Sequence, residues 1–230
     1  MAAANDANAA ALGEIWLGSG SGFKDAVMFT LGTGLGGGIV LDGRVLSGSH
    51  GLGGEIGHLH VRDDLTEPCG CGGYGCLEQC VSATGIVREA RAQMAAGRER
   101  GEEPSAMEAL GDELTAKDVS ELAKKGDPAA LRAMESAARY LGIAMATLAM
   151  TVDPEVFIIG GGVSAAGTWF TDKAERWYHH YSPLTRKKAE VRIASLGSDA
   201  GIVGAASLAV MAGRLWELAG KLPGEAEDKE

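Results

Sequence analysis

All four cysteines of the chain lie within the glycine-rich segment CGCGGYGCLEQC, which spans residues 69–80. Cys69, Cys71 and Cys76 have a C-x-C-x4-C spacing, and His58 precedes them. Three thiolates and one imidazole suit tetrahedral zinc, and the glycines let the chain wrap a small ion without side-chain crowding. We therefore predict a zinc site at this segment.

Three other interpretations compete with zinc. A disulfide is disfavoured in the cytoplasm, a redox pair more typically has a C-x-x-C spacing, and a chance cluster rarely collects every cysteine of a chain. His60 is an alternative to His58 as the imidazole. Cys80 is expected to be a small packing residue on the following helix.

The composition of the 230 residues limits the functions to consider. Hydrophobic residues make up 46%, enough for a core, and the formal net charge is −10. An acidic chain binds nucleic acid poorly unless its basic residues cluster, and the short clusters at 124–125 and 186–188 are expected to be solvated surface. No signal peptide is recognised, and the longest apolar run, 141–152, is too short to span a bilayer. We expect a cytoplasmic protein with neither a nucleic-acid nor a membrane partner.

Two further glycine-rich segments are candidates for ligand contact. Residues 32–38, GTGLGGG, lie between apolar runs and predict a β-hairpin whose backbone amides are placed to hold phosphate oxygens. On this segment alone a purely structural hairpin is an equally good interpretation, because no helix follows the turn and no P-loop ending is present. Residues 158–162, IIGGG, end a buried strand and would let a flat ligand approach the backbone, as in many α/β turns. Asn5 and Asp6, taken alone, indicate only a helix cap.

Apolar periodicity and turn residues predict alternating strands and helices, hence an α/β layer architecture. The expected helices cover residues 6–17, 76–97, 115–126, 127–152, 168–181 and 199–213, with a short helical piece inside 102–114. The expected strands cover residues 26–34, 36–48, 155–163 and 190–196, with a tight turn at Asp42–Gly43. Residues 214–230 are expected to form a charged C-terminal tail.

As a set, these segments resemble the ROK family (repressor, open reading frame, kinase), most of all its bacterial glucokinases. The resemblance covers about residues 5–212 and rests on the order of five motifs, of which GEIGH followed by C-x-C-G-x-x-G-C-x-E is the most specific. The motifs are NDANAAALGE, TLGTGLGGGIVLDGRVLSGSHGLGGEIGH, CGCGGYGCLEQ, VFIIGGGVS and DAGIVGAASLA. The resemblance implies an actin-like ATPase (ribonuclease H-like) fold, in which residues 1–213 form mainly the C-terminal lobe with a zinc-binding insertion.

The resemblance also implies roles for single residues. Asp6 matches the catalytic base that accepts a proton from the sugar's primary hydroxyl as it attacks the γ-phosphate of ATP. Asn5, Glu55 and Glu78 match residues that hold further sugar hydroxyls. His58 matches the zinc-ligand histidine and a sugar contact, which decides against His60, and Cys69, Cys71 and Cys76 complete the structural zinc site. Thr33 and Gly34 match the second phosphate segment, and Gly160, Gly161 and Gly162 match the adenosine side.

One part of the family's pattern is not found. Family members begin with a further lobe, whose Asp-x-Gly-Gly-Thr segment binds the nucleotide phosphates and Mg²⁺, and this sequence contains no such segment. We expect the chain alone to keep its fold and its zinc but to transfer phosphate poorly.

Three functions are weighed on this basis. The first is an ATP-dependent sugar kinase using Mg²⁺ and acting on glucose, with fructose, N-acetylmannosamine, N-acetylglucosamine and allose still open. The second is a sugar-sensing transcriptional repressor, for which the helix-turn-helix domain and a basic face are not found. The third is a zinc-bearing remnant without catalysis. A homodimer is a candidate assembly, because dimers are common in such families.

Overall fold

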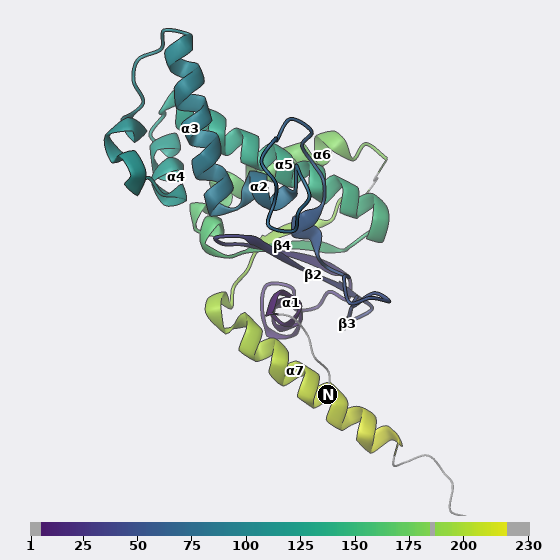
Figure 1. Cartoon of the computed structure of the whole chain (residues 1–230). Coiled ribbons are helices and arrows are strands. Elements are labelled where there is room, and N and C mark those ends of the chain that lie inside the picture. The colour runs from purple at the N-terminus through teal and green to yellow at the C-terminus, as the bar shows by residue number, and fades with distance from the viewer. Residues whose placement is uncertain (1–5, 185–186, 220–230) are drawn as a thin grey trace, which may run out of the picture.

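The computed structural model describes residues 6–184 and 187–219 and centres on a five-stranded mixed sheet with the order β3-β2-β1-β4-β5 (Figure 1). β1 (Ala26–Leu31) pairs antiparallel with β2 (Leu35–Leu41) and parallel with β4 (Val156–Gly160). The short β3 (Arg44–Val45) extends the antiparallel side, and β5 (Glu190–Ile193) extends the parallel side. The predicted strands are therefore confirmed, although each is shorter than expected.

The turn between β2 and β3 has the predicted hairpin geometry. Asp42 and Gly43 both have positive φ, 50° and 71°. A two-residue turn with two positive φ values matches the right-handed twist of the strands that it joins, and Asp-Gly is a favoured pair for it. The prediction from this dipeptide is confirmed.

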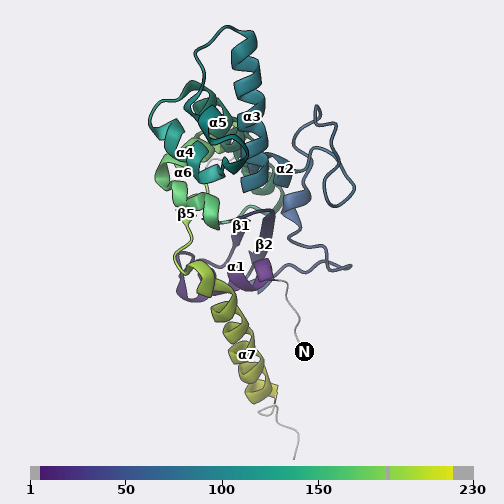
Figure 2. The same ribbon diagram turned by 60° about the vertical axis from the view of Figure 1, so that its left-hand side comes forward.

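Helices cover both faces of the sheet (Figures 1 and 2). One face carries α1 (Asp6–Leu17) and α7 (Ala200–Ala219), and the other carries the remaining helices. These are α2 (Leu77–Val81), α3 (Ala83–Glu99), α4 (Ala116–Lys124), α5 (Pro128–Val152) and α6 (Thr168–Tyr181). Short 3₁₀ turns occur at η1 (Ile56–His58), η2 (Ala106–Glu113), η3 (Gly162–Ala166) and η4 (Gly197–Asp199).

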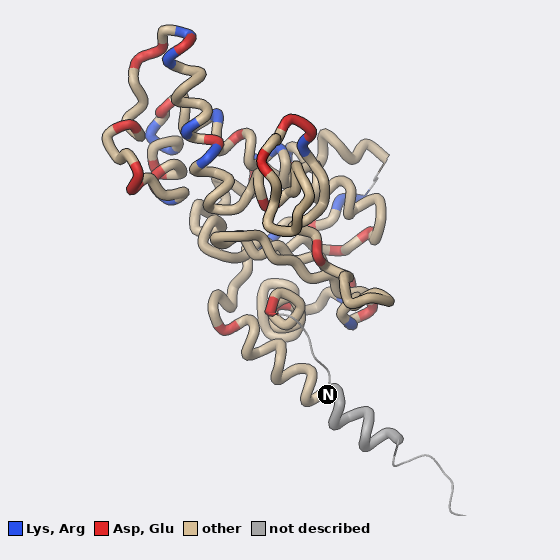
Figure 3. Tube along the Cα trace, in the orientation of Figure 1, with Lys and Arg blue, Asp and Glu red and all other residues tan. Residues whose placement is uncertain are grey.

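Alternating strand residues divide the core into two layers. Along β1, Val27, Phe29 and Leu31 belong to the larger cluster with the helices from α2 to α6, whereas Ala26 and Met28 belong to the smaller cluster with α1. Successive side chains of a strand point to opposite faces, so one strand serves both layers. Charged residues gather around the far end of α3 and α4 and on residues 62–67, before the cysteines, whereas residues 200–210 of α7 carry none (Figure 3).

Two helix predictions need correction. The single helix predicted over 76–97 is wrong, because Ser82 is extended and separates α2 from α3. Its hydroxyl accepts a hydrogen bond from the amide of Gly85, so Ser82 caps a new helix instead of continuing the old one. The last helix is longer than predicted, since α7 continues past residue 213 to Ala219. Among the described residues, no helix combines the length and the hydropathy needed to span a bilayer.

Helices α1 and α7 are joined by close packing and by a buried carboxylate. A side chain on Gly204 would overlap the carbonyl group of Ala9, so glycine lets the two helices touch. Glu14 of α1 is fully buried and accepts hydrogen bonds from four donors. Two are the amide and hydroxyl of Ser19, and two come from the segment before α7, the hydroxyl of Ser195 at 3.3 Å and the amide of Leu196 at 2.8 Å.

We predict that Glu14→Ala lowers the free energy of unfolding by about 3 kcal/mol, because buried donors are left without an acceptor. Urea denaturation followed by circular dichroism measures the change. Glu99→Ala, which removes an exposed glutamate of α3, is the control and should cost less than about 0.5 kcal/mol. Equal losses from the two variants would contradict the role given to Glu14.

Candidate functional site

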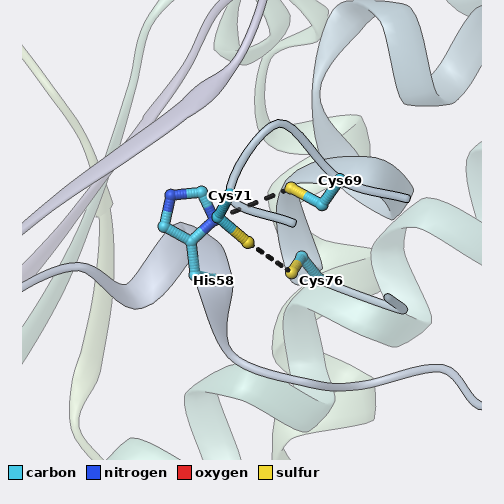
Figure 4. Close-up of side chains that lie close together, drawn as sticks. All are labelled: His58, Cys69, Cys71 and Cys76. Atoms are coloured by element: carbon cyan, nitrogen blue, oxygen red, sulfur yellow. Dashed lines mark hydrogen bonds between the residues drawn. The ribbon is translucent and has the colours of Figure 1, made fainter. Parts of the chain in front are cut away.

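The structure brings His58, Cys69, Cys71 and Cys76 together at the edge of the sheet. One ligand atom from each lies within 4.8 Å of all the others. The Nδ1 atom of His58 lies 3.7 Å from the Sγ atom of Cys69, and the Sγ atoms of Cys71 and Cys76 are 3.6 Å apart (Figure 4). A tetrahedral zinc ion with Zn–S bonds of about 2.3 Å and Zn–N bonds of about 2.0 Å places its ligand atoms about 3.5–3.8 Å apart. The donor types and these spacings both fit zinc.

The loop that carries these ligands is held by backbone hydrogen bonds. The amide of Cys69 donates to the carbonyl of Gly73 at 2.6 Å, and the amide of Leu77 donates to the carbonyl of Leu59 at 2.8 Å. Gly75 has a φ of 67°, and a side chain there would overlap the carbonyl oxygen of Arg62. Only glycine fits where residue 75 passes the backbone of Arg62, and this contact holds Cys76 beside the segment that follows His58.

The two remaining candidates for the cluster have other partners. Both ring nitrogens of His60 are engaged, Nδ1 with the carbonyl of Tyr74 and Nε2 with the carboxylate of Asp63, each at 2.8 Å. The hydrogen bond that His60 donates to the carboxylate of Asp63 raises the pKa of His60. Cys80 is buried in the core on α2, as predicted, and its burial raises the pKa of its thiol to about 11.

Without a metal, the thiols of the cluster differ in acidity. The amide of Gly73 donates to the Sγ atom of Cys71 at 3.4 Å and lowers the pKa of that thiol. Burial raises the pKa of Cys76 to about 12. All four cysteines are free thiols, so the alternative of a disulfide has no support. Zinc binds the thiolate form, and its charge would offset the cost of burying the thiolate of Cys76.

Glu78 connects the cysteine loop to the turn between β1 and β2. Its Oε2 atom accepts a hydrogen bond from the amide of Leu35 at 2.9 Å, and its Oε1 atom lies 3.7 Å from the Sγ atom of Cys69. A side chain on Gly34 would overlap Oε2. Gly34 is therefore a neighbour of Glu78, a contact that the sequence did not predict.

The other predicted carboxylates approach the glycines of β2. Asp6 is exposed at the start of α1, and the next residue, Ala7, lies against Gly36. Glu55 is exposed at the start of η1, and the next residue, Ile56, lies so close to Gly37 that a side chain there would overlap it. Together with Glu78 beside Gly34, the three carboxylates therefore belong to elements that meet at the start of β2 and at the turn before it. Asn5 lies outside the described residues.

A cavity of about 460 Å³ adjoins the turn between β1 and β2. Two predicted nucleotide residues line it, Thr33 and Gly162, although they are far apart in the sequence. Gly160 and Gly161 do not line it: Gly160 is buried in β4, and Gly161 turns the chain with a φ of 85° against the backbone of Leu31. The other lining residues are Gly32, Ala83, Thr115, Ala116, Lys117, Ser120, Glu121, Met134, Val163, Ala165 and Ala166.

Helix α4 supplies the wall of this cavity that sequence reasoning missed. Lys117, Ser120 and Glu121 face it from one side of the helix. The sequence predicted the helix itself from its Thr115 cap, but no spacing in it indicated a ligand. A larger cavity of about 650 Å³ lies at the amino ends of β4 and β5 and contains none of the predicted residues. Ligands of open α/β sheets bind at the carboxyl ends of the strands, which favours the smaller cavity.

The chain is similar to several known proteins over most of its length. A glucokinase of Halalkalibacterium halodurans is 46% identical over 204 residues, covering 87% of this chain and 60% of that protein. A xylose repressor of Caldicellulosiruptor bescii is 30% identical, covering 90% of this chain and 51% of that protein. The crystal structure of a ROK family glucokinase from Streptomyces griseus in complex with glucose and AMPPNP is 40% identical with a TM-score of 0.77, covering 89% of this chain and 66% of that one.

These matches confirm the α/β fold of the actin-like ATPases that the resemblance implied. The chain spans less than two thirds of the length of each of these proteins. A model of the ROK family matches residues 1–212, nearly the whole sequence. On this match and on the order of its motifs, the chain belongs to the ROK family.

Proposed function

We propose that this chain carries the sugar site and part of the nucleotide site of an ATP-dependent hexose kinase, with glucose as the preferred sugar. The main support is that the elements carrying Asp6, Glu55 and Glu78 meet at the start of β2. The histidine–cysteine cluster and the cavity lined by Thr33 and Gly162 adjoin the same elements. The similarity to glucokinases, one of them in complex with glucose and an ATP analogue, supports the same assignment.

In this proposal Asp6 is the catalytic base. Its Oδ1 atom accepts a hydrogen bond from the amide of Ala7 at 2.9 Å, which holds the carboxylate at the start of α1. The side chain is exposed and can accept the proton of the sugar's primary hydroxyl as that oxygen attacks the γ-phosphate. The proton moves to the carboxylate, the new bond forms to phosphorus, and ADP leaves.

Asn5, Glu55, His58 and Glu78 would hold the other hydroxyls. An ionised carboxylate has about four acceptor positions, so Glu78 can bind sugar hydroxyls while it accepts the amide of Leu35. Glu55 is exposed beside the same strand, where its carboxylate would accept hydrogen bonds from sugar hydroxyls. With Nδ1 in the cysteine cluster, His58 presents its other ring nitrogen to a hydroxyl.

The nucleotide would span from the turn between β1 and β2 to the turn after β4. Thr33 and Gly34 would contact the phosphates, and Gly160, Gly161 and Gly162 would let the adenosine side approach the backbone. Mg²⁺ would accompany the triphosphate and neutralise charge that develops during transfer. Zinc would be held by His58, Cys69, Cys71 and Cys76, and it would fix the loop that ends at Glu78.

The zinc site leads to a first test of this proposal. Purified chain should hold about one zinc per molecule by elemental analysis. Cys76→Ser should lose the metal, because the remaining imidazole and two thiolates fill only three of the four tetrahedral positions and a serine hydroxyl is a weak zinc ligand. Cys80→Ser is the matched control, since Cys80 is a core residue outside the cluster, and it should keep zinc. Zinc retained by both variants would overturn the ligand assignment.

A second prediction concerns Asp6 in the enzyme completed with its expected first lobe. Asp6→Asn should lower kcat by about 10²–10⁴-fold while the KM for glucose changes little, because the amide cannot accept the proton. Asp42→Asn makes the same chemical change at the β2–β3 turn, where asparagine tolerates positive φ, and should leave kcat unchanged. Retained turnover in Asp6→Asn would rule this residue out as the base.

A third prediction compares the chain as it stands with a version that carries the expected first lobe. A coupled assay of glucose-dependent ADP release should find much lower turnover in the chain alone. Without the first lobe the substrates would be less enclosed and the transferred phosphate less shielded from water. Comparable turnover in both would show that the chain needs no further lobe. Glucose binding without ADP release in either version would favour a sugar-binding regulator, the second candidate, which the similarity to a xylose repressor supports.

Three further parts of the proposal concern the cellular compartment, the binding partners and the oligomeric state. We propose that the protein acts in the cytoplasm, where ATP is available and thiol ligands stay reduced. The acidic net charge of −10 argues against nucleic acid as a partner. A homodimer stays a prediction from the sequence.

A further inference from the structure

The hydroxyl of Ser120 is buried without a hydrogen-bond partner. Ser120 is 5% exposed, and its Oγ atom has no partner among the residues that the structure describes. A serine or threonine inside a helix usually donates to the carbonyl four residues earlier. Thr147 and Thr151 of α5 do so, with distances of 3.0 and 2.6 Å. Ser120 departs from this pattern, so its hydroxyl is available to a ligand.

Ser120 lines the same cavity as Thr33 and Gly162, and most of that wall is apolar. The side chains around it are small or flexible: Ala83, Ala116, Met134, Val163, Ala165 and Ala166. The charged Lys117 and Glu121 are exposed and belong to the rim. A cavity of about 460 Å³ is within the usual range for small-molecule sites, and an apolar wall with one polar group suits a flat ring that needs one directed contact.

We propose that Ser120 binds the base of the nucleotide, its hydroxyl making a hydrogen bond to a polar edge atom of adenine. This inference rests on the proposed nucleotide site. If the phosphates lie at Thr33, the base would contact the opposite wall of the cavity, which α4 and η3 form. Ser120 is the buried polar side chain of that wall. Helix α4 then contributes to nucleotide affinity, although it contains no glycine-rich motif.

Ser120→Ala should have two effects of opposite sign. The unliganded protein should gain about 2–4 °C in Tm, because alanine removes an unpartnered buried hydroxyl and favours the helix. Affinity for ATP and for adenosine should fall about three- to tenfold, the value of one hydrogen bond, by isothermal titration calorimetry. Affinity for inorganic tripolyphosphate, which has no base, should not change. If Ser120 only supported the fold, Ser120→Ala would change the affinities for adenosine and for tripolyphosphate to the same extent.

Ser136→Ala is the matched control, a partly buried serine of α5 that does not line the cavity, and it should leave all three affinities unchanged. ATP affinity that is equal in Ser120→Ala and the unaltered chain would overturn this inference and leave the proposed function standing. An equal loss for tripolyphosphate would also overturn it, since the contact would then be to phosphate. Failure of the unaltered chain to bind ATP or adenosine would contradict the nucleotide site itself.

Discussion

The close approach of other elements to β2 is the constraint on which the site depends. At Gly36 and Gly37 the strand has no side chains to keep its neighbours at the usual distance. Ala7 therefore lies against one face, and Ile56 lies against the other. Gly34, at the turn before the strand, leaves room for the carboxylate of Glu78. Larger residues at these positions would separate the elements that carry Asp6, Glu55 and Glu78.

The cysteine cluster contributes to the same arrangement from outside the sheet. Its ligands come from η1, from the glycine-rich loop and from the residue before α2, so a bound ion would tie three segments at one point. Glu78 lies two residues after Cys76 and is not one of the four ligands, but its Oε1 atom accepts a weak hydrogen bond from the Sγ atom of Cys69. The hydrogen bond between Leu35 and Glu78 then links Glu78 to the turn between β1 and β2. A metal bound at the cluster would therefore be linked through one short helix to the sugar site proposed above.

Local signals in the sequence predicted the features that depend on few residues. Asp42–Gly43 predicted its turn, Thr115 predicted the start of α4, and the spacing of three cysteines predicted their convergence. The break at Ser82 was missed because serine is tolerated within a helix, and its capping bond depends on how α2 packs. The cavity beside α4 was missed for a related reason. It is formed by segments far apart in the chain, and no local sequence pattern predicts that an alanine or a serine will line a cavity.

The hydrogen bonds of Glu14 have a mechanical consequence for Asp6. Glu14 ties the last part of α1 to Ser195 and Leu196, just before α7, while Gly204 keeps the two helices in contact. The two helices are therefore joined at two places. Asp6 is the first residue of α1, and most of α7 extends beyond the sheet (Figure 1). In the proposed enzyme, a partner that held α7 would therefore also act on the helix that begins with Asp6, the proposed base.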